Sequence, residues 1–207
     1  GVRNLSAGTI QTLTNSNDIT GTRVGIYNSF SIGELTNSGT IGNGLGGIYN
    51  EGSITTIINS GTITGSIVGI ELQRGGTIGT LNNSGSITGA YAITNYGTIT
   101  TLVNSHFITG SNIGIENPDN RTITNLTNSG TIRGNLFDGV ENSGTINEMT
   151  NSGTISGVTN GIHNSGGTIN TLTNNGSITG GTAGITNDTS YSGAFTTLNN
   201  LQGASSS

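Results

Sequence analysis

Two glutamates and a short charged loop are the residues whose types and spacing suggest chemistry in this chain. Glu116 and Glu141 occupy equivalent positions in successive copies of an internal repeat, and a loop with Asp119 and Arg121 follows the first of them. If the copies stack, the two carboxylates lie about 5 Å apart, a spacing suited to general acid–base catalysis or cation binding. The alternative, which we favour, is a solvated face balanced by Arg121 or Arg133.

Other reactive side chains form no recognisable site. Neither His106 nor His163 has a cysteine or a second histidine at metal-ligand spacing, so we expect no metal and no cofactor. Serine and glycine are so frequent that any match to a catalytic triad or phosphate loop is expected by chance. The net charge of −5 leaves no basic stripe for nucleic acid. No apolar run approaches about 18 residues, so we expect no membrane insertion by this segment.

A repeat sets the position of every residue named above. The run Asn-Ser-Gly-Thr-Ile at 37–41 returns, whole or lightly varied, at 59–63, 83–87, 128–132, 151–155 and 174–178. A phrase that recurs at a period in the low twenties is typical of a solenoid. Thr, Ile, Asn, Ser and Gly dominate the composition, which favours short strands joined by turns over helices. In Thr62-Ile63-Thr64 the alternation predicts isoleucine inside and threonine outside.

These patterns predict an all-β fold, a single right-handed parallel β-helix of about eight to nine coils. Each coil has 22–24 residues and three short strands, and the crossover rule favours the right-handed form. We place complete coils at about 8–187, a partial ninth coil at about 188–201 and an irregular tail at 202–207. The solenoid spans 1–207, and we expect it to belong to a longer one because its end coils lack obvious capping elements.

Asparagine recurs at two positions of the repeat. One column stands directly before a turn, where stacked amides can hydrogen-bond from coil to coil and satisfy the backbone of the corner. A second column is broken only at Leu72. We interpret both columns as structural. The predicted Asn ladder comprises Asn15, Asn37, Asn59, Asn83, Asn104, Asn128, Asn151 and Asn174.

Two surfaces are candidates for contact with a partner. The first is a set of outward hydroxyls on the strand after the ladder: Thr40, Thr62, Thr64, Ser86, Thr88, Thr131, Thr154, Ser177 and Thr179. The second is a ridge at the corner where insertions gather, comprising Arg74, Glu116, Asp119, Arg121 and Glu141. Insertions interrupt the repeat, so they can carry specific function. Tolerated surface insertions are the alternative, and we favour it.

The phrase Asn-Ser-Gly-Thr-Ile-Thr-Gly, with Gly-Ile-x-Asn between copies, resembles the passenger repeats of bacterial type V autotransporters. The likeness is greatest to the self-associating, adhesin-like passengers and covers about Gly8 to Leu201. The resemblance implies a right-handed β-helix outside a Gram-negative cell, attached to the outer membrane through a domain outside this segment. It also implies adhesion, cell–cell aggregation or biofilm formation, and it brings no catalytic motif.

Three hypotheses for function follow. The first is a non-enzymatic extracellular rod on the bacterial surface that binds copies of itself or surface proteins and glycans. The second is ice binding through Thr-x-Thr rows, which is weakened because other residues interrupt these rows, namely Asp18, Gly42, Phe107 and Arg133. The third is a glycan-active enzyme that uses the paired glutamates and the charged loop. We favour the first.

Overall fold

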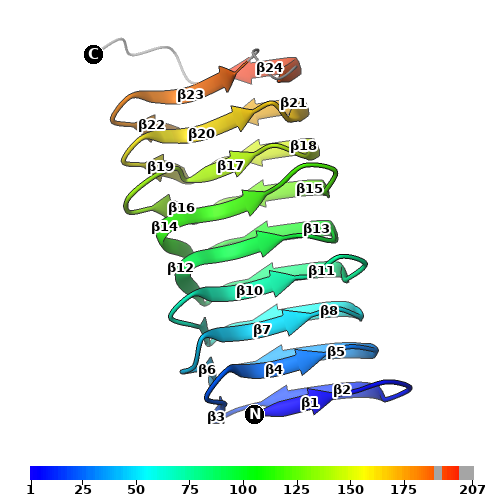
Figure 1. Cartoon of the computed structure of the whole chain (residues 1–207). Helices are drawn as coiled ribbons and strands as arrows, with labels where there is room; N and C mark the ends of the chain where they lie inside the picture. The colour runs from blue at the N-terminus through cyan, green and yellow to red at the C-terminus, as the bar shows by residue number, and fades with distance from the viewer. Residues whose placement is uncertain (189–192, 201–207) are drawn as a thin grey trace.

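The computed structural model describes residues 1–188 and 193–200, and these residues form strands and turns without a helix. Successive coils stack along one axis into a rod, with the N-terminus at the bottom of Figure 1. The strands nearest the viewer run from left to right as the chain climbs, so the coil is right-handed (Figure 1). The predicted fold class is confirmed: parallel strands form a β-solenoid of about eight turns with three strands per coil.

One column of strands, which we call the wide sheet, consists of nine strands of seven residues each. Every neighbouring pair is parallel, and each strand follows the pattern Thr-Ile-x-x-Leu-x-Asn or a variant of it. The strands are β2 (Thr9–Asn15), β5 (Ser31–Asn37), β8 (Ser53–Asn59), β11 (Thr77–Asn83), β13 (Thr98–Asn104), β15 (Thr122–Asn128), β18 (Thr145–Asn151), β21 (Thr168–Asn174) and β24 (Ala194–Asn200).

The other two columns share a second, 15-stranded sheet because two long strands, β12 (Ser86–Asn95) and β14 (Phe107–Asn117), run through both. The Gly-Ile column also contains β1 (Val2–Asn4), β4 (Val24–Asn28), β7 (Gly46–Asn50), β10 (Val68–Leu72), β17 (Val140–Asn142), β20 (Asn160–Ser165) and β23 (Ala183–Asp188). The short column also contains β3 (Asp18–Thr20), β6 (Thr40–Gly42), β9 (Thr62–Thr64), β16 (Thr131–Gly134), β19 (Thr154–Gly157) and β22 (Ser177–Gly180).

The core is built from the four aliphatic rows of the repeat. Because the pairing is parallel and in register, equivalent residues are neighbours, as Ile78 is of Ile54 and Ile99. Leu81 and Ile87 of the same coil are also fully buried. Glycine at the Asn-Ser-Gly corner permits close stacking of backbone on backbone. A Cβ added at Gly61 would lie 2.1 Å from the carbonyl oxygen of Gly39, so no larger residue fits without a shift.

The stacked strands begin close to the N-terminus, within the predicted span of 1–207. Strand β1 pairs with β4 in register, with Asn4 opposite Asn28, so the stack begins before the complete coils predicted from about residue 8. Of the partial ninth coil, β24 pairs with β21 and Phe195 packs against the core. Leu201, the predicted tail at 202–207 and residues 189–192 lie outside the described residues.

Candidate functional site

The Asn ladder is a continuous chain of side-chain hydrogen bonds. Each Nδ2 donates to the Oδ1 of the equivalent asparagine in the next coil, over 2.7–3.0 Å, from Asn15 through Asn174 to Asn200. The same Nδ2 also donates to main-chain carbonyls, which for Asn37 are those of Gly39 and Thr62, both at 3.1 Å. The ladder amides from Asn15 to Asn174 are buried. Their hydrogen bonds hold the corner together and leave no side chain for a ligand.

The second Asn column is a ladder in two segments. It begins at Asn4 and continues through Asn28 to Asn50. At Leu72 the ladder stops, and above it the Oδ1 of Asn95 accepts a hydrogen bond from the backbone N–H of Gly97 at 3.2 Å instead. From Asn95 the amide-to-amide bonds resume, at 2.7–2.8 Å, up to Asn187.

The predicted hydroxyl face lies on the outer side of the short column. Thr64 and Thr88 are in register on β9 and β12, and their hydroxyls form a hydrogen bond of 2.9 Å. The face is narrow, because β3, β6 and β9 have only three residues each. It is also interrupted by Phe107, whose side chain is 43% exposed, and by Arg133. These hydroxyls therefore form short groups.

The wide sheet carries a longer hydroxyl row that the sequence analysis did not single out. The first position of its strands bears a hydroxyl on eight successive strands, and the pairing places these residues side by side: Thr9, Ser31, Ser53, Thr77, Thr98, Thr122, Thr145 and Thr168. We call this the hydroxyl row. The only charged residues on the described strands of this sheet are Glu34 and Glu148. The signal was present in the sequence as the threonine of each Gly-Thr-Ile-x-x-Leu segment.

The predicted loop ridge is not continuous. Arg74 lies between β10 and β11, whereas Asp119 and Arg121 lie between β14 and β15, with the coil of β12 and β13 in between (Figure 1). Two rungs of a stacked sheet separate positions by about 10 Å. Within the described residues, no ion pair joins these three residues to each other or to Glu116 and Glu141. The corner therefore holds separate loops on alternate coils.

The two glutamates that suggested chemistry are neighbours in the Gly-Ile column. Glu116 of β14 pairs with Glu141 of β17, which pairs with His163 of β20. Burial raises the pKa of Glu116, a hydrogen bond from Thr94 lowers it and the charge of Glu71 raises it. Burial also raises the pKa of Glu141, as do the charges of Asp138 and Glu116. Within the described residues neither Arg121 nor Arg133 forms an ion pair with these carboxylates, and the solvated face with nearby arginines stays an interpretation.

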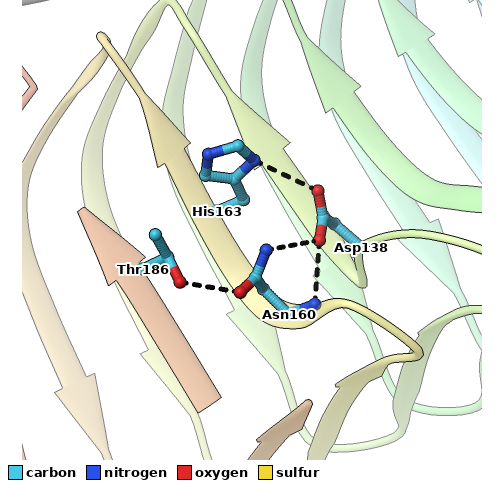
Figure 2. Close-up of polar contacts among 4 residues, drawn as sticks. All are labelled: Asp138, Asn160, His163 and Thr186. Carbon is cyan, nitrogen blue, oxygen red and sulfur yellow. Dashed lines mark hydrogen bonds and ion pairs between the residues drawn. The ribbon is translucent and has the colours of Figure 1, made fainter. Parts of the chain in front are cut away.

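Asp138 adds a buried carboxylate to this row from the corner between β16 and β17. Its Oδ1 accepts two hydrogen bonds of 2.9 Å, from the backbone N–H and from Nδ2 of Asn160, and its Oδ2 lies 3.2 Å from Nδ1 of His163 (Figure 2). Thr186 donates to Oδ1 of Asn160 at 2.7 Å. Asp138 is 5% exposed.

A carboxylate that fixes one ring nitrogen of a histidine is an arrangement used to orient a general base. Figure 2 shows the other ring nitrogen of His163 pointing away from Asp138. The bonds to Asn160, however, join one coil to the next, as the ladder bonds do elsewhere. No group of three or more acidic, histidine or cysteine side chains in the described residues could hold a metal ion. We therefore interpret Asp138 as a corner residue that ties two coils together.

Sequence reasoning missed Asp138, although the repeat held a signal for it. The step from the third aliphatic row to the fourth is eight residues in this coil, from Ile132 to Val140, and seven in the next, from Ile155 to Ile162. The extra residue sits in the run Asn135-Leu136-Phe137-Asp138. An insertion at a corner therefore marked the place where a polar residue could turn toward the neighbouring coil.

Comparison with known proteins identifies no relative. No family model, no curated protein and no solved structure matches this chain. Among the described residues, no helix has the length and apolar character needed to span a membrane.

Proposed function

We propose that this chain is part of a non-enzymatic adhesive rod on a bacterial surface, and that it associates with further copies of itself through the wide sheet. The hydroxyl row on eight successive strands is the observation that carries the proposal. The extracellular location rests on the resemblance of the repeats to autotransporter passengers. Cell–cell aggregation and biofilm formation are the processes such a rod would serve.

The chemistry of the wide sheet favours a second copy as the partner. A hydroxyl is both donor and acceptor, so a face of threonine and serine is complementary to another copy of itself. With Glu34 and Glu148 as its only charges on the described strands, the face has little repulsion to overcome. A face rich in charges of one sign would instead require a partner that carries charges of the other sign.

The magnitude indicates weak contacts that act in numbers. Eight hydroxyls at about 1 kcal/mol net per hydrogen bond give about 8 kcal/mol. The cost of bringing two chains together is about 4–15 kcal/mol, so a single pair of rods associates weakly. Many copies displayed on two cells act together, because each further contact is intramolecular once the first has formed. We therefore expect aggregation of cells to detect self-association more sensitively than a binding measurement on the purified chain.

Ice binding is the second candidate, and the hydroxyl row favours it more than the sequence did. The interruptions that weakened it lie on the short column, whereas this row is unbroken over eight strands. Matching a two-dimensional lattice needs a second unbroken row beside the first. The row that contains Thr12 and Thr56 is interrupted by Glu34, Asn125 and Glu148. Thermal hysteresis equal to that of buffer would remove this candidate.

A glycan-active enzyme has less support. Such enzymes need a pair of carboxylates free to act on a glycosidic bond. Asp138, whose charge acts on Glu141, has both of its oxygens bonded to protein groups. Release of reducing sugar from a panel of acidic polysaccharides would revive this candidate.

The test of self-association uses bacterial cells that display the chain. Thr77 and Thr98 are two exposed neighbours in the hydroxyl row. The double variant Thr77→Lys with Thr98→Lys places positive charge on the proposed contact. We expect clumping, scored by microscopy and settling, to fall to the level of cells without the chain. The matched control, Thr62→Lys with Ser86→Lys, puts the same charge on neighbouring positions of the short column. We expect it to clump like the unmodified chain.

Either of two results would overturn the proposal. If clumping survives Thr77→Lys with Thr98→Lys, the hydroxyl row is not the contact. If the control abolishes clumping equally, the effect is one of charge in general and not of the wide sheet. Far-UV circular dichroism of the purified variants checks that each remains folded.

A further inference from the structure

A cleft of about 430 Å³ opens on the outer side of the Gly-Ile column, between the first coils of the solenoid. Its walls include Arg3 of β1, Arg23 just before β4, Tyr27 of β4, Tyr49 of β7 and Glu51 just after β7. Pockets of roughly 300–1,000 Å³ are the usual size for small ligands. The cleft is therefore large enough for a sugar unit.

A stack of three side chains forms one wall of this cleft. Tyr27 and Tyr49 are in register on adjacent strands, and their rings are stacked with centroids 5.5 Å apart and planes 11° from parallel. The guanidinium carbon of Arg3 lies 5.5 Å from the centre of the Tyr27 ring. Tyr27 is thus in contact with Tyr49 and with Arg3, which leaves it poorly placed to stack on a nucleobase. Polar groups at the cleft must supply the recognition.

The Tyr27 hydroxyl is already engaged with a carboxylate. It donates to Oε2 of Glu51 at 2.6 Å, and this hydrogen bond is the main reason that the pKa of Tyr27 is raised. Burial raises the pKa of Tyr49. The Tyr49 hydroxyl is therefore protonated at neutral pH and can serve as a donor to a ligand. Glu51 keeps further lone pairs that can accept a hydrogen bond from a ligand hydroxyl.

The cleft concentrates the scarce positive charge of this chain. The chain has five arginines against ten acidic residues, yet Arg3 and Arg23 lie at the same cleft. Both are exposed, and neither forms an ion pair within the described residues. Guanidinium groups bind carboxylates and sulfates through paired N–H donors. The site therefore combines two groups that attract an anion with one carboxylate that can accept a further hydrogen bond from a hydroxyl.

We propose that this cleft binds an acidic sugar unit, whose carboxylate or sulfate contacts Arg3 and Arg23 while its ring hydroxyls contact Glu51 and Tyr49. An inorganic anion such as sulfate has no hydroxyl to donate to the remaining lone pairs of Glu51, and a neutral sugar brings no anionic group to the two guanidiniums. The site does not depend on self-association, because none of its residues belongs to the wide sheet. It would allow the rod to hold an acidic polysaccharide.

Titration calorimetry of the purified chain tests this proposal with three probes. The first is a tetrasaccharide of alternating glucuronic acid and N-acetylglucosamine, and the second is the same molecule with its carboxyl groups reduced to alcohols. The third is a sulfated tetrasaccharide, which distinguishes a sulfate ligand from a carboxylate ligand. We expect at least one acidic probe to bind about tenfold more tightly than the reduced one, because charge-assisted hydrogen bonds are lost on reduction.

Matched arginine variants locate the site. We expect Arg3→Gln and Arg23→Gln each to weaken binding about tenfold or more. Arg133→Gln removes the same charge from an exposed position on β16, and we expect binding to remain unchanged. Failure of both acidic probes to bind, equal binding of the reduced probe, or equal weakening by Arg133→Gln would each overturn the proposal. Thr77→Lys with Thr98→Lys should leave sugar binding intact, which separates this site from the self-association contact.

Discussion

Replacing Asn83 with alanine measures what the Asn ladder contributes to stability. The Asn83 side chain is 2% exposed, and its Nδ2 donates to the carbonyls of Gly85 and Phe107, both at 3.0 Å, and to Oδ1 of Asn104 at 2.8 Å. Its Oδ1 accepts from Nδ2 of Asn59 at 2.7 Å. The two N–H groups of the amide share these three acceptors, so at about 1 kcal/mol net for each N–H group and for the bond to Oδ1 we expect the free energy of unfolding to fall by about 3 kcal/mol.

The preceding residue provides a control of the same type. Asn82 lies beside Asn83 on β11, but its side chain is exposed on the outer face of the wide sheet. We expect Asn82→Ala to change the free energy of unfolding by less than about 0.5 kcal/mol. Urea unfolding followed by far-UV circular dichroism gives both values. A difference between the two variants smaller than about 1 kcal/mol, the net value of one bond, would refute the argument that the ladder holds the corner.

Two further predictions concern the glutamates of the Gly-Ile column and the corner residue Asp138. The pKa values of Glu71, Glu116 and Glu141 are raised mainly by burial, so the folded state holds protons that the unfolded state has released. The stability of the folded chain should therefore fall as the pH rises above the ordinary glutamate pKa of 4.5. Thermal unfolding at pH 4.5 and at pH 7 measures this fall, and we expect it to be smaller for Glu116→Gln with Glu141→Gln. An equal fall in the variant would contradict the raised pKa values of these two glutamates. At the corner, Asp138→Ala should lower the free energy of unfolding by about 2–4 kcal/mol, because the buried donors of Asn160 lose their acceptor. His163→Ala should lower it by less than about 1 kcal/mol. Equal decreases in urea unfolding would indicate that the contact between Asp138 and His163 is the main one.

Several particular features could be predicted from the sequence because they repeat. Ile54, Ile78 and Ile99 recur at the coil period, so parallel stacking places them in contact. Asn83 and its equivalents in the other copies each precede a turn, and stacking of the coils brings the amide of Asn83 to that of Asn104. Equivalent residues of a solenoid become neighbours as soon as the register is known. The core and the ladder follow from that register.

The candidate contact surfaces could not be ranked in the same way. The sequence analysis chose the threonines around Ile63 because the Thr-x-Thr pattern is evident there. The threonines at the first position of the wide-sheet strands, such as Thr77 and Thr98, look equivalent in the sequence. Only the structure shows that the second set lies on strands of seven residues and the first set includes strands of three. The width of a face depends on where each strand ends.

The sequence by itself determined the period, the inward rows and the asparagine columns, because each is a relation between one residue and its copy in the next coil. The tertiary structure decided which residues from different parts of a coil meet. Asp138 reaches Asn160 and His163 because an extra residue at its corner turns the chain toward the next coil. Arg3 of β1 and Arg23, just before β4, lie at one cleft. Such meetings depend on backbone direction at irregular corners, and a repeat pattern contains no information about that direction.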